Sequence, residues 1–234
     1  SFCSCTSLTS ILIPSSVKEI GNHAFKDCMN LKQISIPSSV ESFGSGIFEG
    51  VSSLDITGDI TKIPNKLFSE CTTLKQVSIP PSVTSIEDNA FYNCQQLNEI
   101  IFNSSVASIG DNAFSGCSKL TEIKLPSSVI SIGNSAFSGC SSLKQVSLIT
   151  SSQSTENKST GSIGKNAFSK CAMLVQFQVP PFISSIEDYA FSDCSSLTEI
   201  DIPSSVTSIG DNAFSGCSKL TKIILSSSVA SIGN

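Results

Sequence analysis

The sequence has no tryptophan, one histidine and few charged residues, and each shortage excludes a class of function. Because His23 is the only imidazole, a Ser–His or Cys–His nucleophile pair has no other base to use, and a histidine-rich metal site cannot assemble. Charged residues make up 14% of the chain, the formal net charge is −5, and lysine and arginine form no cluster. Such clusters neutralise the phosphates of nucleic acids, so we expect no nucleic-acid partner.

Long apolar runs, a leader sequence and a phosphate-binding loop are also missing. No apolar stretch approaches the roughly 18 residues of a membrane-spanning helix, so we expect no spanning segment. The first residues, Ser1–Cys3, lack the basic start of a signal peptide. Glycine recurs singly and never as G-x-G-x-x-G, so nothing indicates a nucleotide cofactor.

A repeating unit dominates what is present. A phenylalanine, usually preceded by alanine and followed three residues later by cysteine, recurs mostly at steps of 23 residues, and Ser108–Thr121 is identical to Ser208–Thr221. We therefore predict a single solenoid of about ten repeats over residues 1–234. Because solenoids need capping units and the chain opens and stops inside repeats, we expect a fragment whose caps, targeting signal and anchor lie outside it.

Aligned on the phenylalanine, the unit reads L-x-x-I-x-I-P-S-S-V-x-S-I-G-x-x-A-F-x-x-C. The alternation in Ile200–Ile202 is typical of a short, half-buried strand, which Pro203 ends because it has no N–H donor. The pair within Val206–Ile209 points inward again and indicates a second short strand. Asp211–Phe214 is expected to begin a helical turn capped by Asp or Asn, with the phenylalanine filling the core.

The bend before each phenylalanine carries glycines and carboxylates. We expect positive φ at the glycines, of which Gly110, Gly133 and Gly210 are examples. The carboxylate pairs Glu87–Asp88 and Glu187–Asp188 have two interpretations. They cap the start of a helical turn, or they line an acidic edge that binds Ca²⁺ weakly through oxygen ligands.

The spacing of these positions resembles that of the BspA-type leucine-rich repeat, the treponemal subclass, over nearly the whole chain from Phe2 to Asn234. The resemblance implies a curved leucine-rich-repeat solenoid with a parallel β-sheet on one face and short strands, turns or short helical turns on the other. It also implies a surface or secreted protein that binds a protein partner, such as a host matrix or cell-surface protein. It implies no catalytic motif.

Two stretches depart from the pattern. Between Val51 and Phe68 three residues are missing, which predicts a pinch or kink in the stack. Residues 149–161 contain an eight-residue excess rich in serine, threonine and asparagine, which cannot join an apolar core and is expected to bulge outward as a loop. Such insertions lie on a binding face in some repeat proteins, and in others they are neutral surface loops.

Nine of the ten cysteines occupy one column of the repeat, and the chain has no C-x-x-C motif. Neighbouring members of the column lie within reach of a disulfide, but stacked side chains point the same way, and Val51 replaces one cysteine. We favour a stack of buried free thiols that act as small apolar groups. We predict no metal and no cofactor.

Two columns of the first strand form the candidate protein-binding surface: the residue between the two inward positions, and the residue just before the first of them. Alternate side chains of a strand point to opposite faces, so both columns are expected to point outward. Ile101 is the most informative, because Phe102 and Asn103 follow it where other repeats have an aliphatic residue and proline. Single exposed apolar residues are also ordinary on protein surfaces. The candidate residues are Leu12, Gln33, Ser35, Gln76, Ser78, Glu99, Ile101, Glu122, Lys124, Gln145, Gln178, Glu199, Asp201 and Ile224.

Three functions fit these patterns, and catalysis is not among them. The first is an adhesion or protein-recognition module on a cell surface or in a secreted protein. The second is a structural array that self-associates, which the near-identity of the repeats favours. The third is an intracellular scaffold, which free thiols would suit. Glycosylation sequons begin at Asn103 and Asn157 and are usable only if a eukaryote secretes the protein.

Overall fold

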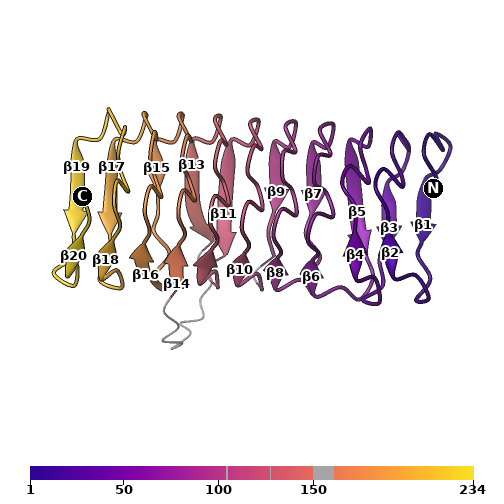
Figure 1. Ribbon diagram of the computed structural model, residues 1–234, viewed down its shortest axis with the longest axis horizontal. Coiled ribbons are helices and arrows are strands. Elements are labelled where there is room, and N and C mark those ends of the chain that lie inside the picture. The colour runs from indigo at the N-terminus through magenta and orange to yellow at the C-terminus, as the bar shows by residue number, and fades with distance from the viewer. Residues whose placement is uncertain (104, 127, 150–160) are drawn as a thin grey trace.

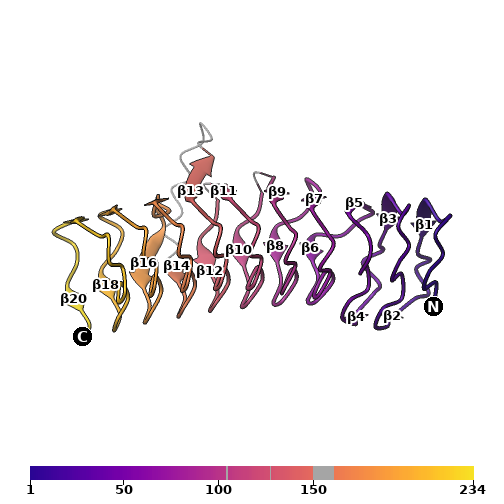
Figure 2. The ribbon, with the colours of Figure 1, turned by 90° about the horizontal axis from the view of Figure 1, so that it is seen from above.

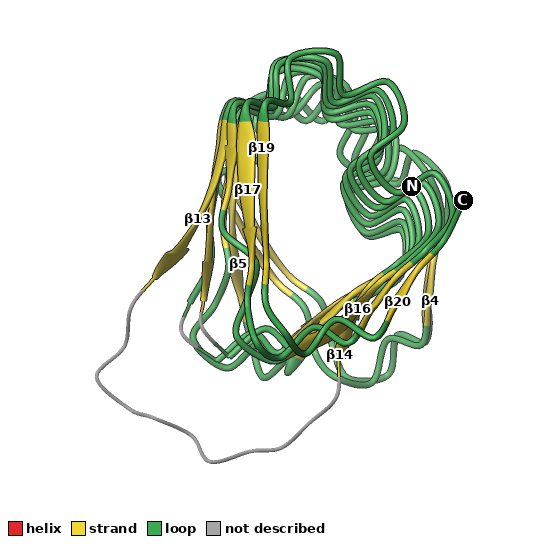
Figure 3. Cartoon of the chain, turned by 90° about the vertical axis from the view of Figure 1, so that its left-hand side faces the viewer, coloured by secondary structure: helices red, strands yellow, loops and turns green. Residues whose placement is uncertain are grey.

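The computed structural model describes residues 1–103, 105–126, 128–149 and 161–234. Within these residues the chain forms short parallel strands joined by turns, and no helix occurs (Figure 3). Successive turns of the solenoid stack in one row from the N-terminus to the C-terminus (Figure 1). Each regular turn contributes one strand to a front sheet and one to a back sheet, as the sequence predicts.

The odd-numbered strands form the front sheet, and the even-numbered strands form the back sheet. Figure 2 shows the back strands following one another along the row. The front strands are β1 (Ser10–Leu12), β3 (Gln33–Ser35), β5 (Ser53–Thr57), β7 (Gln76–Ser78), β9 (Glu99–Ile101), β11 (Glu122–Pro126), β13 (Gln145–Ile149), β15 (Gln176–Phe177), β17 (Glu199–Ile202) and β19 (Lys222–Leu225). The back strands are β2 (Glu19–Ile20), β4 (Ser42–Phe43), β6 (Lys62–Ile63), β8 (Ser85–Ile86), β10 (Ser108–Ile109), β12 (Ser131–Ile132), β14 (Gly161–Ile163), β16 (Ile183–Ile186), β18 (Ser208–Ile209) and β20 (Ser231–Ile232).

In the regular repeats the strand register places each residue beside its counterpart in the next repeat. In the front sheet Glu122 pairs with Gln145 and Ile123 with Val146, and in the back sheet Ile109 pairs with Ile132. A column of the aligned sequence therefore becomes a column of side chains in space. At the short repeat the register shifts, because Asp55 of β5 pairs with Gln33 of β3 on one side and with Ser78 of β7 on the other.

The phenylalanine column forms the centre of the core. From Phe25 to Phe191 the rings of this column are buried, and most neighbouring rings stack nearly parallel, with centroids 4.9 Å apart for Phe91 and Phe114. Aromatic pairs of this kind contribute about 0.5–1.5 kcal/mol beyond the apolar area that they bury. The prediction that phenylalanine fills the interior is confirmed.

The segment before each phenylalanine forms consecutive turns rather than the expected start of a helix. The backbone N–H of Phe91 donates to Ala113 O of the next turn at 2.7 Å, and Asn89 N–H donates to Asp111 O at 2.8 Å. Donors committed to a neighbouring turn cannot form the i to i−4 bonds of a helix. Asn89 adopts a left-handed conformation with φ of 55°, which asparagine tolerates better than most residues.

The prediction of positive φ at the bend glycines is wrong. Gly110, Gly133 and Gly210 are not among the residues with positive φ. They are glycines because the previous turn approaches too closely: a Cβ on Gly110 would lie 2.7 Å from the backbone nitrogen of Asp88.

The close approach comes from a ladder of side-chain acceptors between turns. Asp88 Oδ1 accepts the backbone N–H of Asp111 at 2.8 Å, and Asp111 Oδ1 accepts that of Asn134 at 2.6 Å. In two turns the glycine is replaced by Glu87 or Glu187. The preceding turn has Asn65 or Lys165 in place of the aspartate, and among the described residues neither side chain accepts such a bond. Asp88 and Asp111 therefore accept hydrogen bonds between turns, and do not act as the helix caps that the sequence indicated.

The short repeat disturbs the stack, as predicted. The back sheet is interrupted there, because β2 and β4 pair with each other while β6 begins a separate eight-stranded sheet. The rings of Phe48 and Phe68 are tilted by 37°, whereas the other neighbouring rings of this column are within 10° of parallel. In the expected loop at 149–161, only Ile149, which ends β13, and Gly161, which begins β14, are described; residues 150–160 lie outside the described residues.

The cysteine column is buried and free of disulfides over most of its length. Cys117 Sγ donates to Phe91 O of the previous turn at 3.2 Å, and Cys140 Sγ donates to Phe114 O at 3.2 Å. Burial raises the pKa of the Cys71 thiol to about 12 and holds the pKa of Cys117 well above its ordinary value. The thiols therefore stay protonated inside the stack and act as apolar groups with one donor.

Replacing Gly110 with alanine tests the cause of the glycine column. We expect the variant to lose about 1–3 kcal/mol of unfolding free energy, because the added Cβ forces the Asp88 turn away. The matched control is Gly21→Ala in the same column, where a Cβ meets nothing within 4 Å. Urea unfolding of both variants measures the difference, and equal losses would contradict the explanation.

The buried thiols predict a loss of stability at alkaline pH. Because burial raises their folded-state pKa above the unfolded value of about 8.5, stability is retained below that pH and falls as the pH rises through it. Above that pH, each buried thiol lowers the free energy of unfolding by up to about 1.4 kcal/mol per pH unit. Under reducing conditions, urea midpoints between pH 7 and 10 should fall less steeply for Cys117→Val, which places in this column the residue found at Val51. An unchanged slope would refute the assignment.

Candidate functional site

The front sheet displays the predicted surface residues outward. Of the fourteen candidate residues, all are exposed except Ser35, which is half-buried. The apolar members of this otherwise polar set are well exposed, with Leu12 at 75% and Ile101 at 50%. Ile224, at 45%, is less distinctive, because Ile223 and Leu225 of the same last turn are also exposed.

The front sheet is split into three parts, whereas the back sheet is continuous from β6 to β20. Hydrogen-bonded pairing runs from β1 to β9, from β11 to β15 and from β17 to β19. Just before β9, the N–H of Asn98 donates to Lys75 O of the preceding turn at 3.0 Å. The equivalent bond across the first break, from Thr121 N–H to Asn98 O, is not formed. Between β15 and β17 a single isolated bridge remains, from Gln178 to Asp201.

Each break coincides with a phenylalanine in a strand position that other repeats fill with an aliphatic residue. The ring of Phe102 packs edge-on against Phe114 of the following turn, with centroids 5.9 Å apart and a 77° interplanar angle. Phe177 packs edge-on between Phe168 and Phe191, with 4.8 Å to each. A phenylalanine ring occupies more space than the isoleucine or valine of other repeats, so we expect that each ring keeps the two strands from pairing.

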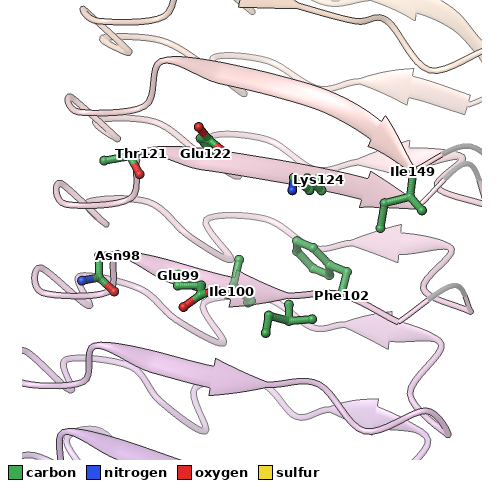
Figure 4. Close-up of a pocket in the computed structure, with 9 residues that line it drawn as sticks. Asn98, Glu99, Ile100, Phe102, Thr121, Glu122, Lys124 and Ile149 are labelled. Atoms are coloured by element: carbon green, nitrogen blue, oxygen red, sulfur yellow. The ribbon is translucent and has the colours of Figure 1, made fainter.

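A groove of about 660 Å³ opens at the first break, between β9 and β11 (Figure 4). At one end lie the carboxylates of Glu99 and Glu122, which occupy the same column on the two strands. Toward the other end lie Phe102, which directly follows β9, and Ile149 at the tip of β13, with Lys124 on β11 between them and the carboxylates (Figure 4). The groove therefore joins an acidic end to an apolar end.

A second groove of about 400 Å³ opens at the other break and is more polar. Gln176, Gln178, Glu199, Asp201 and Lys222 line it. Gln178 Oε1 accepts the backbone N–H of Leu148 at 3.0 Å, which fixes that side chain.

The carboxylates of the first groove have no cationic partner. None of the five ion pairs among the described residues includes Glu99 or Glu122. By contrast, Lys165 Nζ lies 3.0 Å from Asp188 Oδ2 on the back of the stack, and this contact raises the pKa of Lys165 and lowers that of Asp188. The two groove acids are left to solvent, as are most other acids of the described residues.

The two grooves gather some of the predicted residues and not others. Glu99, Ile101, Glu122 and Lys124 meet in the first groove. In the second groove, the predicted residues are Gln145, Gln178, Glu199, Asp201 and Ile224. Neither groove includes the candidates Leu12, Gln33, Ser35, Gln76 and Ser78, which lie on the unbroken part of the sheet.

Sequence reasoning missed the role of Phe177 and the contribution of Ile149. The available signal was the replacement of an aliphatic residue by phenylalanine in an inward column, which we noted only beside Ile101. Asn103, where a sequon begins, donates its side-chain N–H to Val83 O at 3.2 Å, so its amide nitrogen is engaged within the stack. Asn157 lies outside the described residues.

No group of three or more His, Cys, Asp or Glu side chains in the described residues is arranged to hold a metal ion. The same part of the chain has no helix long and apolar enough to cross a membrane. His23 is exposed, with its Nδ1 3.4 Å from Glu49 Oε2.

Parallel strands, one per repeat on the front face, with a stacked apolar interior define a leucine-rich-repeat solenoid. The chain belongs to the BspA-type leucine-rich repeat family, whose model matches in six copies over residues 1–93, 61–160 and 151–234. A comparison with curated proteins finds no significant match.

Solved structures with a similar fold come from several bacteria. A leucine-rich repeat protein from Bacteroides ovatus is 26% identical, with a TM-score of 0.56 over 98% of this chain and 76% of that one. One from Eubacterium ventriosum is 20% identical, with a TM-score of 0.62 over 97% of this chain and 81% of that one. The pneumococcal vaccine antigen PcpA is 19% identical, with a TM-score of 0.50 over 94% of this chain and 68% of that one. At the last two identities the likeness concerns the fold alone.

Replacing Phe102 with isoleucine tests the cause of the first break, because Ile79 occupies the same column in the preceding repeat. We expect β9 and β11 to pair, so that the amide of Thr121 exchanges its hydrogen at least tenfold more slowly. The amide of Lys144, already bonded to Thr121 O at 2.8 Å, provides the internal control. Unchanged exchange at Thr121 would show that the ring does not keep the strands apart.

Proposed function

We propose that this solenoid is a protein-recognition module that binds a protein partner through its front sheet, centred on the groove between β9 and β11. The observation that carries the proposal is the groove itself, which exposed Ile101 and Ile149 line together with the carboxylates of Glu99 and Glu122. An apolar spot bordered by polar groups is typical of a contact surface, because apolar burial supplies affinity and polar groups at its edge supply specificity.

Membership of the BspA-type family supports an interaction role rather than catalysis. We further propose a cell-surface or secreted location and a host matrix or cell-surface protein as partner, because the family that the sequence resembles has such members. A rigid sheet with divergent outward residues on a constant core is suited to this role, since surface residues can change without loss of packing.

A self-associating array is the second candidate. The identity of Ser108–Thr121 with Ser208–Thr221 favours it, because recognition of one ligand usually requires surfaces that differ between repeats. Self-association would appear as a mass that increases with protein concentration in sedimentation equilibrium, with no ligand present.

The test is binding to immobilised matrix proteins and to intact host cells. Ile101→Asp combined with Glu122→Lys should weaken saturable binding at least tenfold, because it places charge in the apolar end and reverses it at the acidic end. Leu12→Asp is the matched control, since Leu12 occupies the same column and is exposed but lies outside the groove. Equal effects of the two variants would place recognition elsewhere, and concentration-dependent mass without any binding would favour the array.

A further inference from the structure

We infer that the groove between β9 and β11 binds an extended peptide segment in which a basic side chain and a branched aliphatic or aromatic side chain are two residues apart. The inference rests on the proposed function and names the chemistry of the partner segment. It follows from the charge at one end of the groove, the apolar surface at the other and the distance between them.

The acidic end calls for a cation. Glu99 and Glu122 occupy one column on neighbouring turns, so two like charges face the same space, and neither takes part in an ion pair among the described residues. Like charges at neighbouring positions of adjacent strands are destabilising by a few tenths to about 1 kcal/mol. A guanidinium or ammonium group placed between the two carboxylates would relieve this repulsion and form charge-assisted hydrogen bonds to both.

The apolar end calls for a hydrocarbon side chain. Ile101 is 50% exposed and Ile149 is 37% exposed, while Phe102, which also lines the groove, has only 5% of its surface exposed. An aliphatic or aromatic side chain of a partner would cover the two isoleucines at about 25 cal/mol for each Å² of apolar surface removed from water.

The distance between the two ends sets the spacing in the ligand. Glu99 and Ile101 are two residues apart on one strand and point to the same face, about 6.6 Å from each other at the usual strand rise. An extended ligand repeats this spacing, so its basic and apolar side chains reach both ends only when one residue separates them. Adjacent basic and apolar residues would point to opposite sides of the ligand strand.

Lys124 adds selection against a second cation. It occupies the position on β11 that corresponds to Ile101 on β9, beside the apolar end. Its ammonium group repels a basic side chain there, so a segment with cations at both positions binds less well than one with a single cation. The groove therefore distinguishes a basic–apolar pair from a general polybasic segment.

Synthetic ten-residue peptides in a serine–threonine background test the inference, with fluorescence anisotropy as the readout. The set contains Arg-x-Ile, Ile-x-Arg, adjacent Arg-Ile, Glu-x-Ile and Arg-x-Arg. At least one of the first two should bind tenfold more tightly than the other three, and its affinity should fall as the salt concentration rises.

Two double variants locate the effect. Glu99→Gln with Glu122→Gln should reduce the preference for arginine over glutamate at least tenfold. Glu19→Gln with Glu41→Gln, on β2 and next to β4 of the back sheet, removes the same charge and should leave the preference unchanged. Melting temperatures of both variants confirm that they are folded.

The outcomes separate this inference from the proposed function. If protein binding is lost in the Ile101→Asp, Glu122→Lys variant but the peptides show no preference, the front face recognises a folded surface and the inference is wrong. If the peptides bind with equal preference to both glutamine variants, the cation site is not at Glu99 and Glu122, which also overturns it. If neither protein nor peptide binds, the proposed function fails as well.

Discussion

Hydrogen bonds from each turn to the next fix the register on which the whole stack depends. Within each continuous part of a sheet the strands pair with their counterparts in the next turn, and the turn segments do the same through bonds such as that from Phe91 N–H to Ala113 O at 2.7 Å. Because residues of the regular repeats lie beside their counterparts, one favourable contact recurs along the row. Stacked rings, thiols bonded to carbonyl oxygens and the Asp88–Asp111 ladder all follow from this register.

The periodic parts of the structure could be predicted from the sequence because periodicity alone determines them. An alternation such as Ile200–Ile202 establishes a strand with one inward face, and repetition at a fixed step establishes stacking. Features that depend on contacts between turns could not be predicted. The sequence of a single unit resembles the start of a helix, but its N–H groups donate to carbonyl oxygens of the neighbouring turn instead. Gly110 alone suggests a bend, whereas its true cause is the close approach of Asp88 in the preceding turn.

The candidate surface shows the same division. The strand pleat predicted which residues face outward, and the structure exposes them. The grooves were not predicted, because they depend on whether the ring at Phe102 or Phe177 fits under the sheet or separates its strands. A sequence gives the size of a side chain but not the space left for it by Phe114 or Phe191. The contribution of Ile149 to the first groove depends on the extra length of β13, which precedes the inserted residues.

From β6 to β20 the back sheet is continuous while the front sheet is divided, which gives this part of the solenoid unequal stiffness. Bending that opens the front must stretch side-chain packing at the two breaks but breaks no strand pairing there, apart from the one bridge at Gln178. Bending that opens the back must rupture backbone hydrogen bonds between β6 and β20. The part of the solenoid from β6 to β20 therefore bends more easily in the direction that opens the front than in the direction that opens the back. A load applied along its length would be taken up by flexing at Phe102 and Phe177 before any turn came apart.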